Sequence, residues 1–251
     1  MGSENAVADS VERISDRGAD VISRDRGVRE TPRVLKSAVI DERIDENSSV
    51  EDIQKKVNAM IFAARALGYR VAADNLEHYV RGLGGVKHLS RSWLRSFRKV
   101  KEAEKTNLER FQNNNILKEL RKVTQSQTIK ISDRWERQIT YNNAGFSFEE
   151  LFYASGDSTL SSRGSFTITI SGKEVRVKGL VTHNWHDKYD WHVGWQAEVP
   201  GFGSIPDAAL KKLQDHGKAR EYELKCKWNH RLDTSFNIGD SQIKWNWRIS
   251  L

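Results

Sequence analysis

The sequence is poor in residues that cross-link or stiffen a chain: it has one cysteine and three prolines among 251 residues. A single cysteine excludes an intramolecular disulfide framework and a zinc cluster built from several cysteines. Cys226 stands in the alternating series Tyr222, Leu224, Cys226 and Trp228. We therefore expect it to be a small buried side chain and not a nucleophile.

Long apolar runs are also missing. No stretch of about 18 consecutive apolar residues occurs, so we predict no membrane-spanning helix. Residues 1–38 lack the apolar segment of a secretory signal peptide, so we expect the protein to be made without Sec-type export.

Aromatic residues are absent from residues 1–47, where eight basic and eleven acidic residues give a net charge of −3. Such a segment buries too little apolar surface to offset its ordering entropy, so we predict a flexible arm that serves in docking or export. Residues 48–251 carry +10, which is the formal +7 of the whole chain less the −3 of the arm. This basic charge favours anionic partners such as nucleic acid, phospholipid head groups or pyrophosphate.

Residues 48–124 have helical periodicity. Ser48 and Glu51 form a capping-box pattern before a helix that ends at Gly68. A second helix is predicted over 71–81, and an N-cap at Ser90 precedes a long polar helix over 100–123. Basic residues surround Trp93 and Phe97 in this part, but no nucleic-acid-binding motif accompanies them. A solvated helix face is therefore favoured, and nucleic acid is disfavoured as a partner.

From residue 125 onward the apolar period is two. A hairpin is predicted over 166–177, and Gly179 predicts a β-bulge because the apolar phase slips by one at Leu180. A helix over 207–217 and strands over 222–228 and 243–249 follow. We predict an α+β fold with a flexible arm over 1–47, an α-helical domain over 48–124, and a β-rich activity domain over 125–251. The last would be a twisted antiparallel sheet, or open half-barrel, with one helix.

Residues 182–192 contain three histidines, two aspartates, one tyrosine and two tryptophans. His183, His186, Asp187 and Asp190 can supply nitrogen and oxygen ligands for a divalent metal. If the preceding strand continues through them, however, His183 and Asp187 share one face while His186 and Asp190 share the other. An aromatic strand that ends in a charged turn accounts for the same residues.

The sequence Asp-Lys-Tyr-Asp-Trp at 187–191 resembles the Asp-x-Tyr-Asp core of the colicin M family of bacteriocins. The hairpin, the helix and the strand around it follow in the order seen in that family's activity domain. The resemblance implies an α-helical N-terminal part, an open half-barrel, and cleavage of lipid II between undecaprenol and pyrophosphate with a divalent cation, expected to be Mg²⁺. It implies catalytic roles for Asp187, Tyr189 and Asp190.

The family also has a His-Arg pair six and seven residues after the second aspartate, where this sequence has Gln196 and Ala197. His192, or His230 with Arg231, are the candidates to supply the missing catalytic groups.

The resemblance further implies lipid II at a membrane surface as the substrate, an immunity protein, and a secretion or injection apparatus reached through the N-terminal arm. It implies synthesis in the bacterial cytoplasm without a signal peptide and action in the target periplasm. Two other functions stay open. One is a metal-dependent nuclease or other hydrolase that uses His183, His186 and Asp187. The other is a non-enzymatic basic module of a phage-like particle, with Trp245 and Trp247 in its core or interface.

Overall fold

A computed structural model describes residues 44–45, 47–141, 149–191, 196–199 and 203–250, all within the compact unit Val39–Leu251. Most of the expected arm over 1–47, and His192, lie outside these residues. The described residues form helices followed by a large open sheet, which confirms the predicted α+β class with an α-helical N-terminal part. None of the described helices combines the length and the apolar character needed to cross a bilayer.

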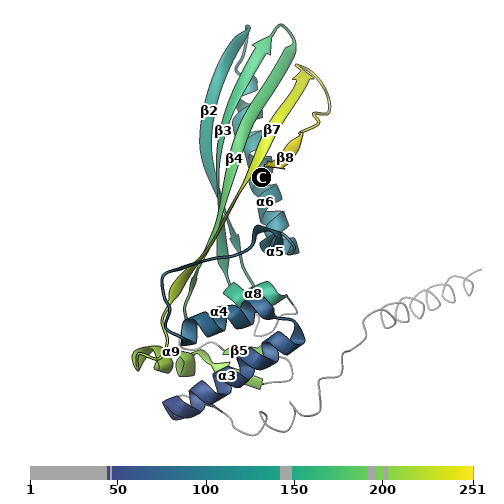
Figure 1. Ribbon diagram of the computed structural model, residues 1–251. Coiled ribbons are helices and arrows are strands. Elements are labelled where there is room, and N and C mark those ends of the chain that lie inside the picture. Colours follow the sequence, from purple (N-terminus) through teal and green to yellow (C-terminus); the bar gives the residue numbers. More distant parts are fainter. Residues whose placement is uncertain (1–43, 46, 142–148, 192–195, 200–202, 251) are drawn as a thin grey trace, which may run out of the picture. The chain divides into compact units, whose positions relative to one another are not determined.

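The main sheet is mixed and has the order β1-β7-β4-β3-β2, with β8 also paired to β7. Its strands are β1 (Val86–His88), β2 (Gln127–Ile139), β3 (Ser158–Ser171), β4 (Glu174–Tyr189), β7 (Tyr222–Asn237) and β8 (Trp247–Ser250). All pairs are antiparallel except β1 with β7. The four long strands lie side by side in Figure 1. A separate hairpin joins β5 (Gln196–Val199) to β6 (Gly203–Pro206).

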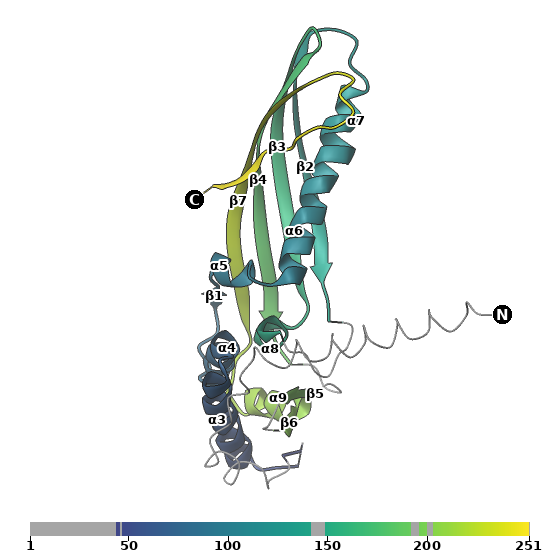
Figure 2. The same cartoon turned by 90° about the vertical axis from the view of Figure 1, so that its right-hand side faces the viewer.

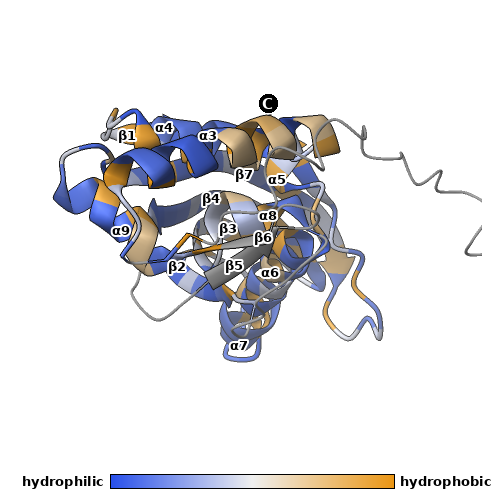
Figure 3. Ribbon diagram, turned by 90° about the horizontal axis from the view of Figure 1, so that it is seen from below, coloured by the Kyte–Doolittle hydropathy of each residue, from blue (hydrophilic) through white to orange (hydrophobic). Residues whose placement is uncertain are grey.

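The N-terminal helices follow the predicted boundaries closely. They are α3 (Val50–Leu67), α4 (Arg70–Val80) and the single turn α5 (Arg91–Leu94). The α3 helix ends at Gly68, whose positive φ of 94° suits glycine. Its cap is Ser49, which accepts from the Asp52 N–H, so the predicted Ser48–Glu51 pair was one residue too early. Figure 3 shows hydrophilic and hydrophobic residues alternating along α3, as expected of a helix with one buried face.

The predicted polar helix over 100–123 is present but not uniform. It consists of α6 (Arg98–Arg110), a π-helical segment (Phe111–Ile116) and the short α7 (Leu117–Leu120). The α6 helix lies along one face of the long sheet (Figures 1 and 2) and contacts β2 and β3. Its buried positions are Val100, Ala103, Glu104, Asn107 and Leu108, which is the spacing of one helix face.

Two further helices complete the described fold. Helix α9 (Asp207–Asp215) confirms the predicted helix and packs against α3. Helix α8 (Glu150–Ser155) was not predicted and packs against α4, where Glu150 accepts the N–H groups of Val71 and Ala72. The sequence signal for α8 is weak because six residues are too few to show a period.

The buried face of the sheet falls into two apolar clusters separated by polar residues. Along β4, Val181 belongs to one cluster and Trp185 to the other, with His183 between them. The same change occurs at His230 in β7 and at Ser162 in β3. In α6 it occurs at Glu104 and Asn107. One polar layer therefore crosses four elements and joins the helix to the sheet.

Gly179 does not form the predicted bulge. The pairing of β4 is continuous from Glu174 to His186 with β3 and from Glu174 to Tyr189 with β7. Gly179 pairs with Phe166, and a Cβ at Gly179 would lie 2.1 Å from Phe166 Cδ1. A Cβ at Gly164 would lie 2.6 Å from Phe166 Cε2 and 2.7 Å from Phe111 Cε1. The two glycines thus leave room for the Phe166 ring between the sheet and the π-helical segment, which the phase of the sequence could not reveal.

The last predicted strand, over 243–249, is shorter than expected. Only Trp247–Ser250 pairs with β7, and Trp245 instead packs against Phe236 with ring centroids 5.9 Å apart. The preceding strand, predicted over 222–228, continues to Asn237 because its alternation of buried and exposed residues persists through the polar residues His230 and Thr234.

We expect Gly179→Ala to lower the free energy of unfolding by about 1–3 kcal/mol, because the added methyl group overlaps the Phe166 ring. Urea denaturation followed by circular dichroism measures the change. Leu180→Ala, at an exposed neighbouring position, should change stability by no more than about 0.5 kcal/mol. In a Phe166→Leu background the same glycine substitution should cost less. An equal cost in both backgrounds would show that the ring is not what requires the glycine.

Candidate functional site

The β4 strand runs through the histidine and aspartate cluster and ends at Tyr189. His183, Asp187 and Tyr189 therefore lie on the inner face of the sheet, and His186 is exposed on the other. The proposed ligand set His183, His186, Asp187 and Asp190 is not brought together at one point. Strand geometry, rather than sequence proximity, decides which of these side chains can cooperate.

Tyr189 is 6% exposed and lies in an aromatic cluster. Its ring stacks on Tyr222 with centroids 5.0 Å apart, and Trp191 meets it edge-on at 5.7 Å. Burial raises the pKa of Tyr189 well above its ordinary value. The phenol therefore stays protonated, and the ring holds the end of β4 by packing.

Asp187 is half-buried, and its Oδ2 is buried without a hydrogen-bond partner among the described residues. Burial raises the pKa of Asp187 to about 8; the Lys188 N–H opposes this, and the negative charges of Asp190 and Asp157 add to it. Asp187 is thus largely protonated at neutral pH and can act as a proton donor. Trp191 Nε1, four residues on, is likewise buried without a partner.

Asp190 differs from Asp187 in its surroundings. Lys188 Nζ lies 3.0 Å from Asp190 Oδ2 and 2.6 Å from Glu221 Oε2. One cation thus bridges two carboxylates beside the end of β4. The motif therefore places a protonated carboxyl at Asp187 next to a charge-paired carboxylate at Asp190.

The candidate replacements for the His-Arg pair lie apart. His230 and Arg231 are consecutive in β7, so His230 is buried at 4% exposure on the inner face and Arg231 is exposed on the outer face. They cannot act on one substrate atom as a pair. His192 lies outside the described residues. Gln196 and Ala197 fall in β5 and pair with Pro206 and Ile205 of β6.

The structure instead brings His230 and His183 together with Glu104 of α6. One ligand atom from each of these three buried residues lies within 4.8 Å of the others, so the group can hold a metal ion. His183 Nε2 is 3.1 Å from His230 Nδ1, and His230 Nε2 is 3.5 Å from Glu104 Oε1. Sequence analysis missed Glu104. An acidic residue on the buried stripe of α6, between Ala103 and Leu108, is the signal that could have identified it.

Further polar groups surround this cluster. Arg95 donates to both Glu104 oxygens, at 2.8 and 3.1 Å, and the Trp228 indole N–H donates to Oε2 at 2.8 Å. Burial acts to raise the pKa of Glu104, but the Arg95 guanidinium, together with the nearby His230 and His183, outweighs it and holds the pKa below its ordinary value. Glu104 is therefore ionised inside the core.

The charge on Glu104 orients a chain of hydrogen bonds. Burial lowers the pKa of His183 to about 3 and also lowers that of His230, so both rings are neutral. A neutral His230 directs its Nε2–H towards Glu104, and its Nδ1 then accepts from His183 Nε2–H. His183 Nδ1 in turn accepts from the Ser162 hydroxyl at 2.7 Å, and Asn107 donates to Ser162 Oγ at 2.9 Å. Ser162 is fully buried, so its hydroxyl is not presented to a substrate.

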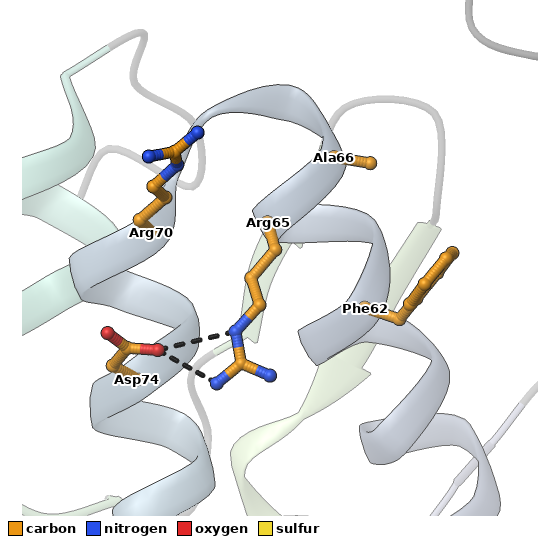
Figure 4. A pocket seen from close by; sticks show the side chains of 5 residues that line it. All are labelled: Phe62, Arg65, Ala66, Arg70 and Asp74. Atoms are coloured by element: carbon orange, nitrogen blue, oxygen red, sulfur yellow. Dashed lines mark hydrogen bonds and ion pairs between the residues drawn. The ribbon is translucent and has the colours of Figure 1, made fainter.

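A surface pocket lies between α3 and α4 and is lined by Phe62, Arg65, Ala66, Arg70 and Asp74 (Figure 4). Arg65 in this pocket already forms ion pairs with Asp74, at 2.8 Å, and with Glu77. It contains no histidine or cysteine that could act as a base or a nucleophile. The pocket therefore offers no chemistry comparable to that of the β4 residues.

Comparison with protein families, with curated proteins and with solved structures finds no match to this chain.

We expect buried His183 to lower the free energy of unfolding as the pH drops from about 6.5 to 4.5 in a chelator-treated buffer, a contribution that the raised pKa of Asp187 opposes. The folded pKa of His183 lies below its ordinary 6.5. Below pH 6.5 the unfolded chain therefore binds a proton that the folded chain excludes, which costs about 1.4 kcal/mol per pH unit. Urea denaturation at several pH values measures this slope.

The His183→Gln variant should have a shallower slope, because glutamine does not titrate. His186→Gln, which removes an exposed histidine, should keep the wild-type slope. If His183→Gln has the same slope as the unmodified protein, buried neutral His183 is not the origin of the acid sensitivity.

Proposed function

We propose that this protein is a phosphoester hydrolase with the chemistry of colicin M bacteriocins, which cleaves lipid II between undecaprenol and pyrophosphate and so stops peptidoglycan synthesis. The observation that carries the proposal is Asp187. Its carboxyl is half-buried, has an oxygen without a partner among the described residues, and has its pKa raised to about 8. It occupies the first acidic position of the Asp-x-Tyr-Asp motif.

A carboxyl in these surroundings costs stability, because a buried acceptor without a partner loses its hydration and gains nothing in return. Strongly shifted pKa values of this kind gather at functional sites. The indole N–H of Trp191, four residues after Asp187, is a buried hydrogen-bond donor that also has no partner among the described residues. The end of β4 thus holds one unsatisfied carboxyl oxygen and one unsatisfied hydrogen-bond donor, four residues apart in the chain.

The two aspartates suit different steps of phosphoester hydrolysis. When water attacks the phosphorus bonded to the prenyl oxygen, the bond between phosphorus and that oxygen breaks. The departing undecaprenol oxygen then needs a proton, which protonated Asp187 can supply. Asp190, which is ion-paired with Lys188, can accept a proton from the attacking water. Environment alone sets these opposite roles for two carboxyls of one motif.

The proposal includes a divalent cation, expected to be Mg²⁺. Mg²⁺ binds through one or two carboxylates together with substrate phosphate oxygens. Asp190 and the pyrophosphate would therefore supply its ligands, and the ion would neutralise charge on the phosphate. The family's His-Arg pair is absent at positions 196 and 197. In this proposal Lys188, which bridges Asp190 and Glu221, supplies a positive charge beside Asp190.

The net charge of +10 over residues 48–251 favours an anionic substrate. The basic side chains Arg163, Lys178, Lys227 and Arg231 lie on the outer face of the sheet, opposite the inner face that holds Asp187. An immunity protein, delivery through the N-terminal arm, and action in the target periplasm belong to the same proposal.

The nuclease alternative is less well supported, because His183 and His186 point to opposite faces of β4.

Asp187→Asn should reduce lipid II cleavage by about 100-fold or more, since asparagine cannot donate the proton. It should also raise the free energy of unfolding at pH 7–8 by about 1 kcal/mol or more. The folded pKa of Asp187 exceeds its ordinary 3.8, so at this pH the folded chain must take up a proton that the unfolded chain lacks, and asparagine removes that cost. Undecaprenol release from lipid II and urea denaturation measure the two effects. His186→Gln serves as the matched control and should change neither.

Asp190→Ala should abolish cleavage while lowering the free energy of unfolding by no more than about 1 kcal/mol, because its ion pair with Lys188 lies near the surface. The assay compares undecaprenol release with and without Mg²⁺ for both proteins at equal folded concentration. Wild-type turnover by this variant would remove Asp190 from the site. The absence of turnover by the unmodified protein with any divalent cation would instead favour the non-enzymatic binding module.

A further inference from the structure

The polar layer beneath α6 contains the donor set of a transition-metal site. Glu104, His183 and His230 come from three different elements, are each less than 9% exposed, and offer two imidazole nitrogens and one carboxylate oxygen. Two histidines and one carboxylate are a donor set that proteins use for zinc and for non-haem iron. We propose that these three residues bind Zn²⁺ as a structural brace between α6 and the sheet. The proposal is independent of the hydrolase function.

The surrounding hydrogen bonds already orient the ligands. His183 Nδ1 lies 2.7 Å from Ser162 Oγ, and Nε2 faces His230. In the metal-bound form His183 would carry its proton on Nδ1 and donate it to Ser162, which frees the Nε2 lone pair for the ion. Trp228 holds Glu104 Oε2, and Arg95 fixes the plane of the carboxylate. Metal-binding histidines and carboxylates are commonly fixed by such outer contacts, which set the ring orientation and lower the cost of ordering.

The distances between ligand atoms suit a small ion. Two ligands of a tetrahedral zinc ion at about 2.0–2.1 Å from the metal are about 3.3 Å apart. His183 Nε2 and His230 Nδ1 are 3.1 Å apart. No pair in the group exceeds 4.8 Å, so closing round an ion requires movements of about 1.5 Å at most. Rotation of the His230 ring and of the Glu104 carboxylate can supply movements of that size.

Asn107 gives a second and independent indication. Its side chain is 0% exposed, and its Oδ1 has no hydrogen-bond partner among the described residues. Asn107 follows Glu104 by three residues on the same face of α6, and its Nδ2 binds Ser162, the partner of His183. An unsatisfied oxygen here can accept a hydrogen bond from a metal-bound water, which would be the fourth ligand.

The chemistry of the donors selects the metal. Mg²⁺ prefers oxygen ligands and keeps several waters, which a buried site with two imidazoles does not accommodate. Imidazole-rich sites favour Zn²⁺ and its neighbours in the transition series. The brace would therefore retain its ion under conditions that remove Mg²⁺ from the proposed hydrolase site.

The test measures metal content in the full chain. Unmodified protein, His230→Gln and His186→Gln are purified from zinc-supplemented cultures, and zinc per chain is measured by mass spectrometry after gel filtration. We expect about one zinc ion in the unmodified protein and in His186→Gln, and a loss of about tenfold or more in His230→Gln. Zinc retained by His230→Gln, or lost from His186→Gln, would overturn the proposal.

A second measurement does not depend on the folding of a variant. The unmodified protein is refolded from urea with Co²⁺ in place of zinc. A visible absorption band of tetrahedral Co²⁺ that Zn²⁺ abolishes is expected, together with a fall of several degrees in Tm when a strong chelator is added. The absence of both the band and bound zinc in the unmodified protein would show that the layer is held by hydrogen bonds alone.

Discussion

The buried carboxylate of Glu104 is the interaction on which the joining of α6 to the sheet depends. An ionised group inside the core is tolerated only if donors replace its hydration, and Arg95 and Trp228 supply them. These hydrogen bonds form only when α6 lies at one position along the strands, where Glu104 is beside Trp228. Removing one partner of a buried ion pair typically costs about 3–5 kcal/mol, so a shifted helix would be strongly disfavoured.

The same layer fixes the phase of β4. His183 must face inward to reach Ser162 and His230, and a slip of one residue would turn it to solvent. Asp187 follows His183 by four residues and therefore faces inward as well. The geometry of the proposed catalytic carboxyl thus depends on polar contacts made a few residues earlier in the same strand.

Glu104 and Asp187 show how the surroundings of a carboxyl decide whether it keeps its proton. Glu104 is the more buried of the two, but a guanidinium and an indole N–H keep it ionised. Asp187 has an oxygen without a donor and two other carboxylates nearby, so it holds its proton. We interpret the first as structural and the second as chemical, because only the second leaves an unsatisfied atom in the motif.

Sequence periodicity predicted the long helices, the hairpin of β3 and β4, helix α9 and the two faces of β4, because these depend on local spacing. It misread Gly179, since whether a strand bulges depends on Phe166 across the sheet rather than on neighbouring residues. It missed β1 because the three-residue strand is defined only by its pairing with β7, 137 residues further on at Val86↔Glu223. Glu104 was missed for the same reason, since its partners come from other elements.

The most direct measurement is the ionisation of Asp187 itself. The side-chain carboxyl carbons of aspartate are labelled with ¹³C, the Asp187 resonance is assigned from its absence in Asp187→Asn, and its shift is followed across the pH range. A midpoint near 8 is predicted, as expected of a carboxyl that keeps its proton at neutral pH. A midpoint near the ordinary aspartate value of about 3.9 would contradict the assignment of Asp187 as the proton donor.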